Sequence, residues 1–477
     1  MTKYIYTILI AGLAATSCKK DLAEINKNPN AAENPQPDYL LTATQKITSD
    51  AYWGADNNFN STLLIIQHWA KIQYTEPDRY IFSNSSFTSL WSTVYAQSLT
   101  NLNTIIQLPA ERTNDNYKGV ATILRAWAFQ LLTDAYGSIP YKQAGNIREY
   151  LTPGYNTQQE VYYGLLDELK AAGALLNPSG PAIAGDIIYG GKIDRWKKFA
   201  NALRLRIALR IADRQPQKAG EVINEVLNDA GGLISTTDEA ARFIYTASPQ
   251  HNPVAAWFDT RDDFRIGKTL VDKLYALNDP RLPIFANKPT DPTVTNYVGV
   301  PSGLTNSDAN NLGFAKTSKP GSYFSAATAP AVIVSYAEVL FGRAEAAARG
   351  LTTENAENLY NQAIKASLNQ YGITDLTVIS NYTNQSDVKY NAASYKKSIG
   401  EQKWIALFGQ GLEAFAEWRR LDYPQLTPGV AGQLEGKIPV RFIYPGSEQA
   451  LNKTNYTRAV ETQGVDNLLT KLWFDQN

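Results

Sequence analysis

Apolar residues recur along much of this chain at the spacing of an α-helix, and this periodicity constrains the fold more than any other feature. Trp196, Phe199, Leu203, Ile207 and Ile211 are separated by three, four, four and four residues. That spacing places all five side chains on one face of a helix. The face must be buried against other apolar surface, so we expect a helix packed in a helical core.

Three more segments show the same pattern. Residues 161–176 follow the acidic Glu160, while 334–349 and 355–371 are each followed by a glycine, the residue that most readily ends a helix. The last two segments, with Ala344, Ala347 and Ala363 for close approach, resemble a tetratricopeptide hairpin in length. A generic helical hairpin fits them equally well. The chain is thus predicted to be all-α, with tetratricopeptide-like hairpins as a scaffold.

Long irregular segments separate the predicted helices. They cover residues 246–264, 291–330 and 425–455, and are rich in Gly, Pro, Asn, Ser and Thr. Long loops on a rigid scaffold often carry binding residues. We therefore expect these loops to form the ligand-binding face.

The N-terminal segment indicates the compartment. Lys3 precedes a short apolar run, and small residues then lead to Cys18, the only cysteine of the chain. This pattern is typical of a bacterial lipoprotein signal, in which the cysteine sulfur receives a lipid. It predicts a signal peptide at 1–17, a lipidated flexible tether at 18–39 and one domain at 40–477, with Cys18 as the lipid attachment. A secretory signal with an incidental cysteine is the alternative.

Composition excludes several kinds of function. Lys and Arg together number 45, as do Asp and Glu, so there is no basic excess for a nucleic-acid partner. One cysteine permits neither an intrachain disulfide nor a multi-cysteine metal site. Only His68 and His251 are available for the many reactions that depend on histidine.

Motifs for catalysis or cofactor binding fail on inspection. Gly267-Lys268-Thr269 resembles the end of a phosphate-binding loop, but Asp262 stands where that loop needs its first glycine. A loose dinucleotide pattern at 409–414 follows an apparent helix rather than a strand. His68 lies in an apolar helical stretch and is expected to be structural. No catalytic residue and no cofactor are therefore expected.

Two acidic groupings are equally weak. Asp56, Asn58 and Asn60 alternate as in a calcium loop, yet Ser61 and Gln67 replace the required glycine and glutamate. We predict no metal, although a weak calcium site stays open. The acidic cluster within 259–263 is expected to be a solvated loop or helix start, because it does not show two carboxylates placed across a sugar ring.

Five segments in a fixed order, together with Cys18, resemble the SusD/RagB family of outer-membrane nutrient-binding lipoproteins, and its SusD-like subgroup in particular. They include a Tyr-Gly-x-x-Pro turn after a helix, an Asp-Pro-Arg element, a Tyr-Ala-Glu helix and the closing segment. Their positions are 22–30, 125–141, 278–282, 335–346 and 439–456.

The resemblance implies a Bacteroidetes-type surface protein, lipid-anchored to the cell outer membrane, that binds a nutrient and is not an enzyme. It implies tetratricopeptide-like helical pairs with a face built of loops. It also implies a partner, a SusC-like TonB-dependent transporter. Arg281, Glu338 and Glu345 would then be buried, paired scaffold residues, because burying a charge without a partner is costly.

We expect the nutrient to be an oligo- or polysaccharide, while a peptide or another nutrient stays open. Sugars pack their C–H faces on aromatic rings while amide and charged side chains bind the hydroxyls. Aromatic residues in predicted loops are the candidates for glycan binding, although each could instead pack on the scaffold. They are Tyr52, Trp53, Tyr74, Trp257, Phe258, Tyr323 and Phe324. A helical scaffold lipoprotein for protein or peptide partners is the alternative function.

Overall fold

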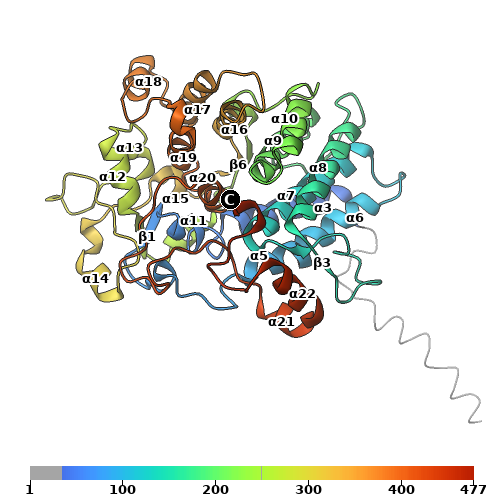
Figure 1. Cartoon of the computed structure of the whole chain (residues 1–477), viewed down its shortest axis with the longest axis horizontal. Coiled ribbons are helices and arrows are strands. Elements are labelled where there is room, and N and C mark those ends of the chain that lie inside the picture. The colour runs from blue at the N-terminus through green and yellow to red at the C-terminus, as the bar shows by residue number, and fades with distance from the viewer. Residues whose placement is uncertain (1–34, 249, 477) are drawn as a thin grey trace, which may run out of the picture.

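The computed structural model describes residues 35–248 and 250–476, and helices dominate it (Figure 1). This confirms the all-α prediction. The longer helices are α3 (Pro37–Trp53), α6 (Leu99–Gln107), α7 (Asp115–Tyr136), α8 (Gln158–Leu175), α9 (Ile193–Ile211), α10 (Pro216–Leu227), α12 (Lys268–Ala276), α16 (Tyr336–Ala348), α17 (Ala356–Gln370), α18 (Leu376–Thr383), α19 (Tyr395–Ala406), α20 (Gly411–Leu421) and α22 (Lys453–Gln463). The shorter ones are α4 (Thr62–Ile65), α5 (Thr88–Thr93), α11 (Pro253–Phe258), α13 (Leu282–Phe285), α14 (Asn306–Asn311), α15 (Ser322–Ser325) and α21 (Gly446–Leu451).

The predicted signal peptide, Cys18 and most of the tether lie outside the described residues. The first described helix, α3, begins at Pro37, three residues before the start predicted for the domain. Proline is favoured in the first turn of a helix, and Asp38 there interacts well with the helix dipole. Among the described residues, no helix has the length and apolar character needed to cross a membrane.

The helices predicted from periodicity are present with small shifts. α9 contains the whole apolar stripe, and α8 begins with a reciprocal capping box between Thr157 and Glu160. Val334 was wrongly placed in a helix. It ends strand β6 (Ala331–Val334), and the Ser335 side chain then caps α16 by accepting from the Glu338 backbone amide.

Consecutive helices pack as hairpins. α7 packs on α8, α8 on α9, α9 on α10, and α16 on α17, as in tetratricopeptide proteins. Gly342 lets α16 approach α9 closely, because a Cβ there would lie 3.1 Å from Leu209 Cδ1. In Figure 1, α7 to α10 lie together on one side, and the half with α11 to α15 lies on the other.

A network of buried ion pairs joins these helices. Arg206 of α9 donates to Glu338 of α16 at 2.7 Å, and Arg210 of α9 contacts Glu413 and Glu417 of α20. Burial alone would raise the Glu417 pKa, but Arg420, Lys403 and Arg210 outweigh it and hold that pKa well below its usual value. The network fixes the relative positions of α9, α16, α19 and α20.

The scaffold roles expected from the family resemblance are confirmed. Arg281 is fully buried and forms a two-pronged pair with the adjacent Asp279, at 2.9 and 2.6 Å. Glu345 is fully buried against Arg420, and Glu338, which is 6% exposed, pairs with Arg206. All three charges are therefore satisfied inside the protein.

Short antiparallel strand pairs occur in the loop-rich regions. The structure describes three two-stranded sheets. Their strands are β1 (Trp69–Lys71) with β5 (Phe264–Ile266), β2 (Ile139–Pro140) with β3 (Tyr155–Asn156), and β4 (Ala241–Phe243) with β6. The segments predicted to be irregular are mostly so, but they also contain α11, α14, α15, α21 and the first residue of β5.

Candidate functional site

The pairing of β1 with β5 brings two distant segments together. Lys71 pairs with Phe264, and just beyond that pair the Ile72 amide donates to the Asp263 carbonyl at 3.0 Å. Residues 72–74, which follow β1, therefore run beside residues 261–263, which precede β5. This places Tyr74 next to Arg261.

Tyr74 presents its ring to solvent. Its side chain is 55% exposed, and its backbone has φ of +54°. Residues other than glycine rarely adopt this left-handed conformation, and where they do the position is often functional. The arrangement therefore turns a large ring outward at a cost in backbone energy.

Arg261 lies between two aromatic rings. Its guanidinium carbon is 4.8 Å from the centre of the Tyr74 ring and 4.7 Å from that of the Trp257 ring. A guanidinium stacks well on aromatic faces and still donates hydrogen bonds from its edge. We call Tyr74, Arg261 and Trp257 the aromatic–arginine surface.

The short helix α11 positions Trp257. The Asn252 side chain caps α11 by accepting from the Val254 amide at 2.7 Å and donates to the Ala329 carbonyl at 2.9 Å. The Trp257 ring is half-buried and meets Phe59 edge to face, with 5.6 Å between ring centres. One part of the ring is thus fixed by the core while the rest stays accessible.

Asp263 is buried and binds two of the three residues of the aromatic–arginine surface, Trp257 and Arg261. Its buried carboxylate accepts from Trp257 Nε1 at 2.7 Å, from Lys71 Nζ at 2.9 Å and from Arg261 at 3.1 Å. Burial alone would raise the Asp263 pKa, but the Trp257 bond and the Lys71 charge outweigh it and hold that pKa below its usual value. Asp263 therefore remains charged and orients both Trp257 and Arg261.

Only some of the predicted aromatic candidates meet at this surface. Tyr74 and Trp257 form it, and the half-buried Phe258 lies beside them against Trp69, with ring centres 6.5 Å apart. Tyr323 is also half-buried but belongs to another cluster of aromatic rings, in which its ring centre lies 4.9 Å from that of Tyr371.

The prediction was wrong for Tyr52, Trp53 and Phe324. Tyr52 and Trp53 are only 1% and 2% exposed, because α3 continues through both residues to its end and buries them. Phe324 is buried against Phe408, with ring centres 4.5 Å apart. None of these rings can offer a face to a sugar.

Arg261 and Asp263 were not among the residues predicted from the sequence. Asp259 is exposed as expected for a solvated cluster, whereas the side chain of Asp263 is 0% exposed. Nothing in the local sequence separates the two aspartates. Only the long-range pairing of β1 with β5 places Asp263 over Lys71.

His68 and Asn58, two further residues singled out in the sequence, make hydrogen bonds inside the protein. His68 is fully buried, as predicted, and its Nε2–H donates to the Trp404 carbonyl at 3.1 Å, while burial lowers its pKa to about 3. Asn58, of the calcium-like pattern, donates to Gly409 O at 3.1 Å and accepts from Gly411 N at 2.8 Å. Across residues 35–248 and 250–476, no group of three or more potential metal ligands is arranged to hold an ion.

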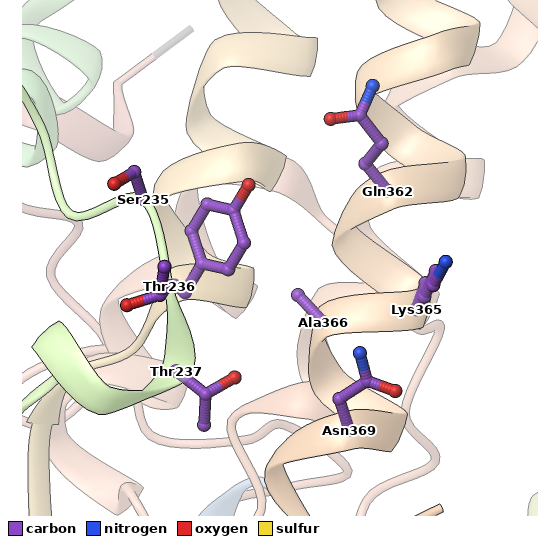
Figure 2. Close-up of a pocket in the computed structure, with 8 residues that line it drawn as sticks. Ser235, Thr236, Thr237, Gln362, Lys365, Ala366 and Asn369 are labelled. Carbon is purple, nitrogen blue, oxygen red and sulfur yellow. The ribbon is translucent and has the colours of Figure 1, made fainter. Parts of the chain in front are cut away.

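A separate pocket of about 410 Å³ lies between residues 235–237 and α17. Figure 2 shows Ser235, Thr236 and Thr237 on one side and Gln362, Lys365, Ala366 and Asn369 of α17 on the other. Tyr336 is the single aromatic residue of its lining. The pocket therefore offers hydrogen bonds but little ring surface for a sugar.

The fold defines a class: a protein of tetratricopeptide-like helical pairs with a face built of loops. Comparison with family models matches residues 29–445 to the SusD-like family described as "Starch-binding associating with outer membrane". The chain belongs to the SusD-like family, which confirms the resemblance seen in the motifs. It is therefore a non-catalytic binding protein of the outer membrane.

Solved structures agree with this assignment. One, named a chitin-binding protein, is 29% identical with a TM-score of 0.83, and the match covers 93% of this chain and 100% of that one. A SusD homologue from Bacteroides uniformis is 27% identical, with a TM-score of 0.82 and coverage of 92% and 100%. A chitin-binding SusD homologue from Flavobacterium johnsoniae, at 23% identity, a TM-score of 0.83 and coverage of 92% and 99%, shares the fold. Comparison with curated proteins finds no match.

Proposed function

We propose that this protein captures an oligo- or polysaccharide at the cell surface and passes it to a SusC-like TonB-dependent transporter. The observation that carries the proposal is the aromatic–arginine surface, where an exposed Tyr74 ring and a fixed Trp257 ring flank Arg261. Rings of this kind stack on the C–H faces of a sugar, and the guanidinium edge donates to its hydroxyls. Lipidation of Cys18 is the proposed anchor.

Chitin fragments are the first ligand to test. The relative at 29% identity is named a chitin-binding protein, and the family description names starch. Both polymers present C–H faces and hydroxyls, so an aromatic platform serves either. A panel should therefore contain chito- and malto-oligosaccharides together with soluble polysaccharides.

The test is affinity electrophoresis of the soluble form that begins after Cys18, compared with Tyr74→Ala and Trp257→Ala. Tyr39→Ala is the matched control, since Tyr39 is a tyrosine 73% exposed in the first turn of α3. We expect retardation by at least one glycan that Tyr74→Ala and Trp257→Ala weaken about tenfold and Tyr39→Ala leaves intact. Absence of retardation by every glycan would contradict the proposal and favour a scaffold for protein or peptide partners.

The transporter step has its own test. The lipoprotein and the transporter would be co-expressed, solubilised and purified through a tag on the transporter. The experiment is done from cells that produce either wild-type protein or a Cys18→Ala variant. If the wild-type protein co-purifies with the transporter and the variant does not, anchoring at Cys18 brings the two proteins together. Equal co-purification and equal membrane association of both forms would contradict the proposed anchor.

A further inference from the structure

A pocket lies along α6, away from the aromatic–arginine surface. Its volume is about 330 Å³. Its walls come from α5, α6, the loop between β2 and β3, and Glu448 of α21. None of these elements contributes to the aromatic–arginine surface, and Figure 1 shows α6, β3 and α21 on the other side of the molecule from β1.

One face of α6 supplies neutral hydrogen-bonding groups. Four residues at positions i, i+3, i+4 and i+7 of the helix line the pocket, and they are two hydroxyls and two amides: Thr100, Asn103, Thr104 and Gln107. The Thr104 hydroxyl donates to the Thr100 carbonyl at 2.8 Å, so its lone pairs are left for a ligand donor. The opposite face of α6 is buried in the core.

A π-helical turn aligns the half-buried Tyr95 and the largely buried Trp91, which is 6% exposed, with this polar face. Residues Val94–Ser98 form the turn between α5 and α6. In a regular α-helix, Leu99 would follow Trp91 and Tyr95 on the same face, but Leu99 is buried in the core and Thr100 lines the pocket instead. The extra residue of a π turn produces this shift, and such turns are frequent at functional sites.

The loop between β2 and β3 forms the outer wall. Gly145 presses against α6, since a Cβ there would lie 2.2 Å from Asn103 Nδ2. The far end of the loop is held where Asn452 and Asn455 donate to the carbonyls of Pro153 and Thr152, at 2.9 and 3.0 Å. Between these fixed points, residues 147–151 project outward.

The outer wall is apolar although it faces solvent. Ile147 and Leu151 are 74% and 88% exposed, and Tyr150 lines the pocket between them. Exposed apolar side chains that gather on one loop tip are typical of an interaction site, and here they adjoin the pocket.

The pocket is almost uncharged. Of the described residues that line it, Glu448 alone carries a charge, and its Oε2 accepts from the Tyr155 hydroxyl at 2.7 Å. A ligand that fits must have an apolar face for the rings and neutral polar groups for α6. Small-molecule pockets begin near 300 Å³, so this one suits one or two sugar rings.

We propose that this pocket is a second carbohydrate site, which holds one or two neutral sugar residues at the end of a chain. Its ligand class rests on the proposed function, but its residues and position do not. An adjoining hollow of about 280 Å³ shares Asn103 and Ala144 with the pocket and gives the chain a path to continue.

The test uses ¹⁹F NMR of the soluble form labelled with 5-fluorotryptophan. Trp91 lines this pocket and Trp257 lies in the aromatic–arginine surface, so each site has its own reporter, assigned with Trp91→Phe and Trp257→Phe. Chitobiose and maltose, then the tetrasaccharides, are titrated in. We expect the Trp91 signal to shift with saturation.

Thr104→Arg fills the pocket, and Thr104→Ser is the matched control that keeps the hydroxyl. We expect the arginine variant to lose the Trp91 shift or to need at least about tenfold more sugar, while its other tryptophan signals stay native and show that it is folded. A shift of Trp257 without Trp91 would overturn this proposal and leave the proposed function intact. A shift of Trp91 alone would support the pocket and count against the aromatic–arginine surface, and no shift at either site would overturn both.

Discussion

Replacing Asp263 by asparagine should destabilise the protein strongly. The carboxylate accepts from Trp257, Lys71 and Arg261 at 2.7 to 3.1 Å, and its side chain is 0% exposed. An asparagine has the same shape but one acceptor oxygen, so its amide would face a donor in either orientation. Lys71, 3% exposed, would lose its ion-pair partner but keep the hydrogen bond from Nζ to Asn60.

The magnitude follows from the burial of this pair. Removing one member of a buried ion pair costs about 3–5 kcal/mol. We expect the lower end, about 3 kcal/mol, because burial already lowers the Lys71 pKa and the amine can release its proton when Asp263 is gone. The free energy of unfolding would be measured by urea titration at pH 7.

The double variant Asp263→Asn, Lys71→Met is the control. It removes both charges and leaves an apolar side chain over Phe264, whose ring centre lies 4.3 Å from Lys71 Nζ. We expect it to recover at least about half of the loss, since neutral replacements of a buried pair are tolerated. A loss below about 1 kcal/mol in the single variant, or no recovery in the double, would refute this account of the site.

The pH dependence gives a second check of the same residue. The folded-state pKa of Asp263 lies below its usual value, so its stabilisation is present above the unfolded pKa of about 3.9 and is lost as pH falls through the folded pKa. The difference in stability between parent and Asp263→Asn should therefore shrink below about pH 4. A constant difference from pH 7 to pH 3 would contradict the assigned charge state.

Three further predictions follow from the structure. The pKa of His68 in the folded protein is about 3, so the stabilisation that neutral His68 provides is present above about pH 6.5 and is lost as pH falls toward 3. His68→Gln should therefore reduce the fall of the melting temperature over that pH range. Glu417→Gln leaves Arg210, Lys403 and Arg420 short of one buried anion, and should cost about 3–5 kcal/mol in urea unfolding, where a cost near zero would contradict the network. Tyr74→Gly relieves the φ of +54° while removing the ring, so calorimetry should show weaker glycan binding at an unchanged or higher melting temperature.

The helical scaffold could be predicted because its signal is local. The apolar stripe of α9 needs only the sequence from Trp196 to Ile211, and the capping box of α8 needs only Thr157 to Glu160. Burial of Arg281 came from the family resemblance, and its partner, Asp279, is two residues away.

The aromatic–arginine surface could be predicted only in part because its signal is not local. The three-residue strands β1 and β5 are too short to show an alternating pattern, so nothing in the sequence pairs Tyr74 with Arg261. Tyr52 and Trp53 precede a glycine and were read as loop residues, whereas the helix extends to Trp53 and buries both. The sequence alone shows neither which distant strands pair nor at which residue a helix ends.

The most direct test of capture without catalysis combines two readouts on one sample. The soluble form that begins after Cys18 would be titrated calorimetrically with the glycan that it binds best, and the same mixture would then be assayed for new reducing ends. We expect saturable binding that Trp257→Ala weakens by about tenfold, with no new reducing ends. New reducing ends, or binding that is the same in Trp257→Ala and the parent, would contradict this expectation.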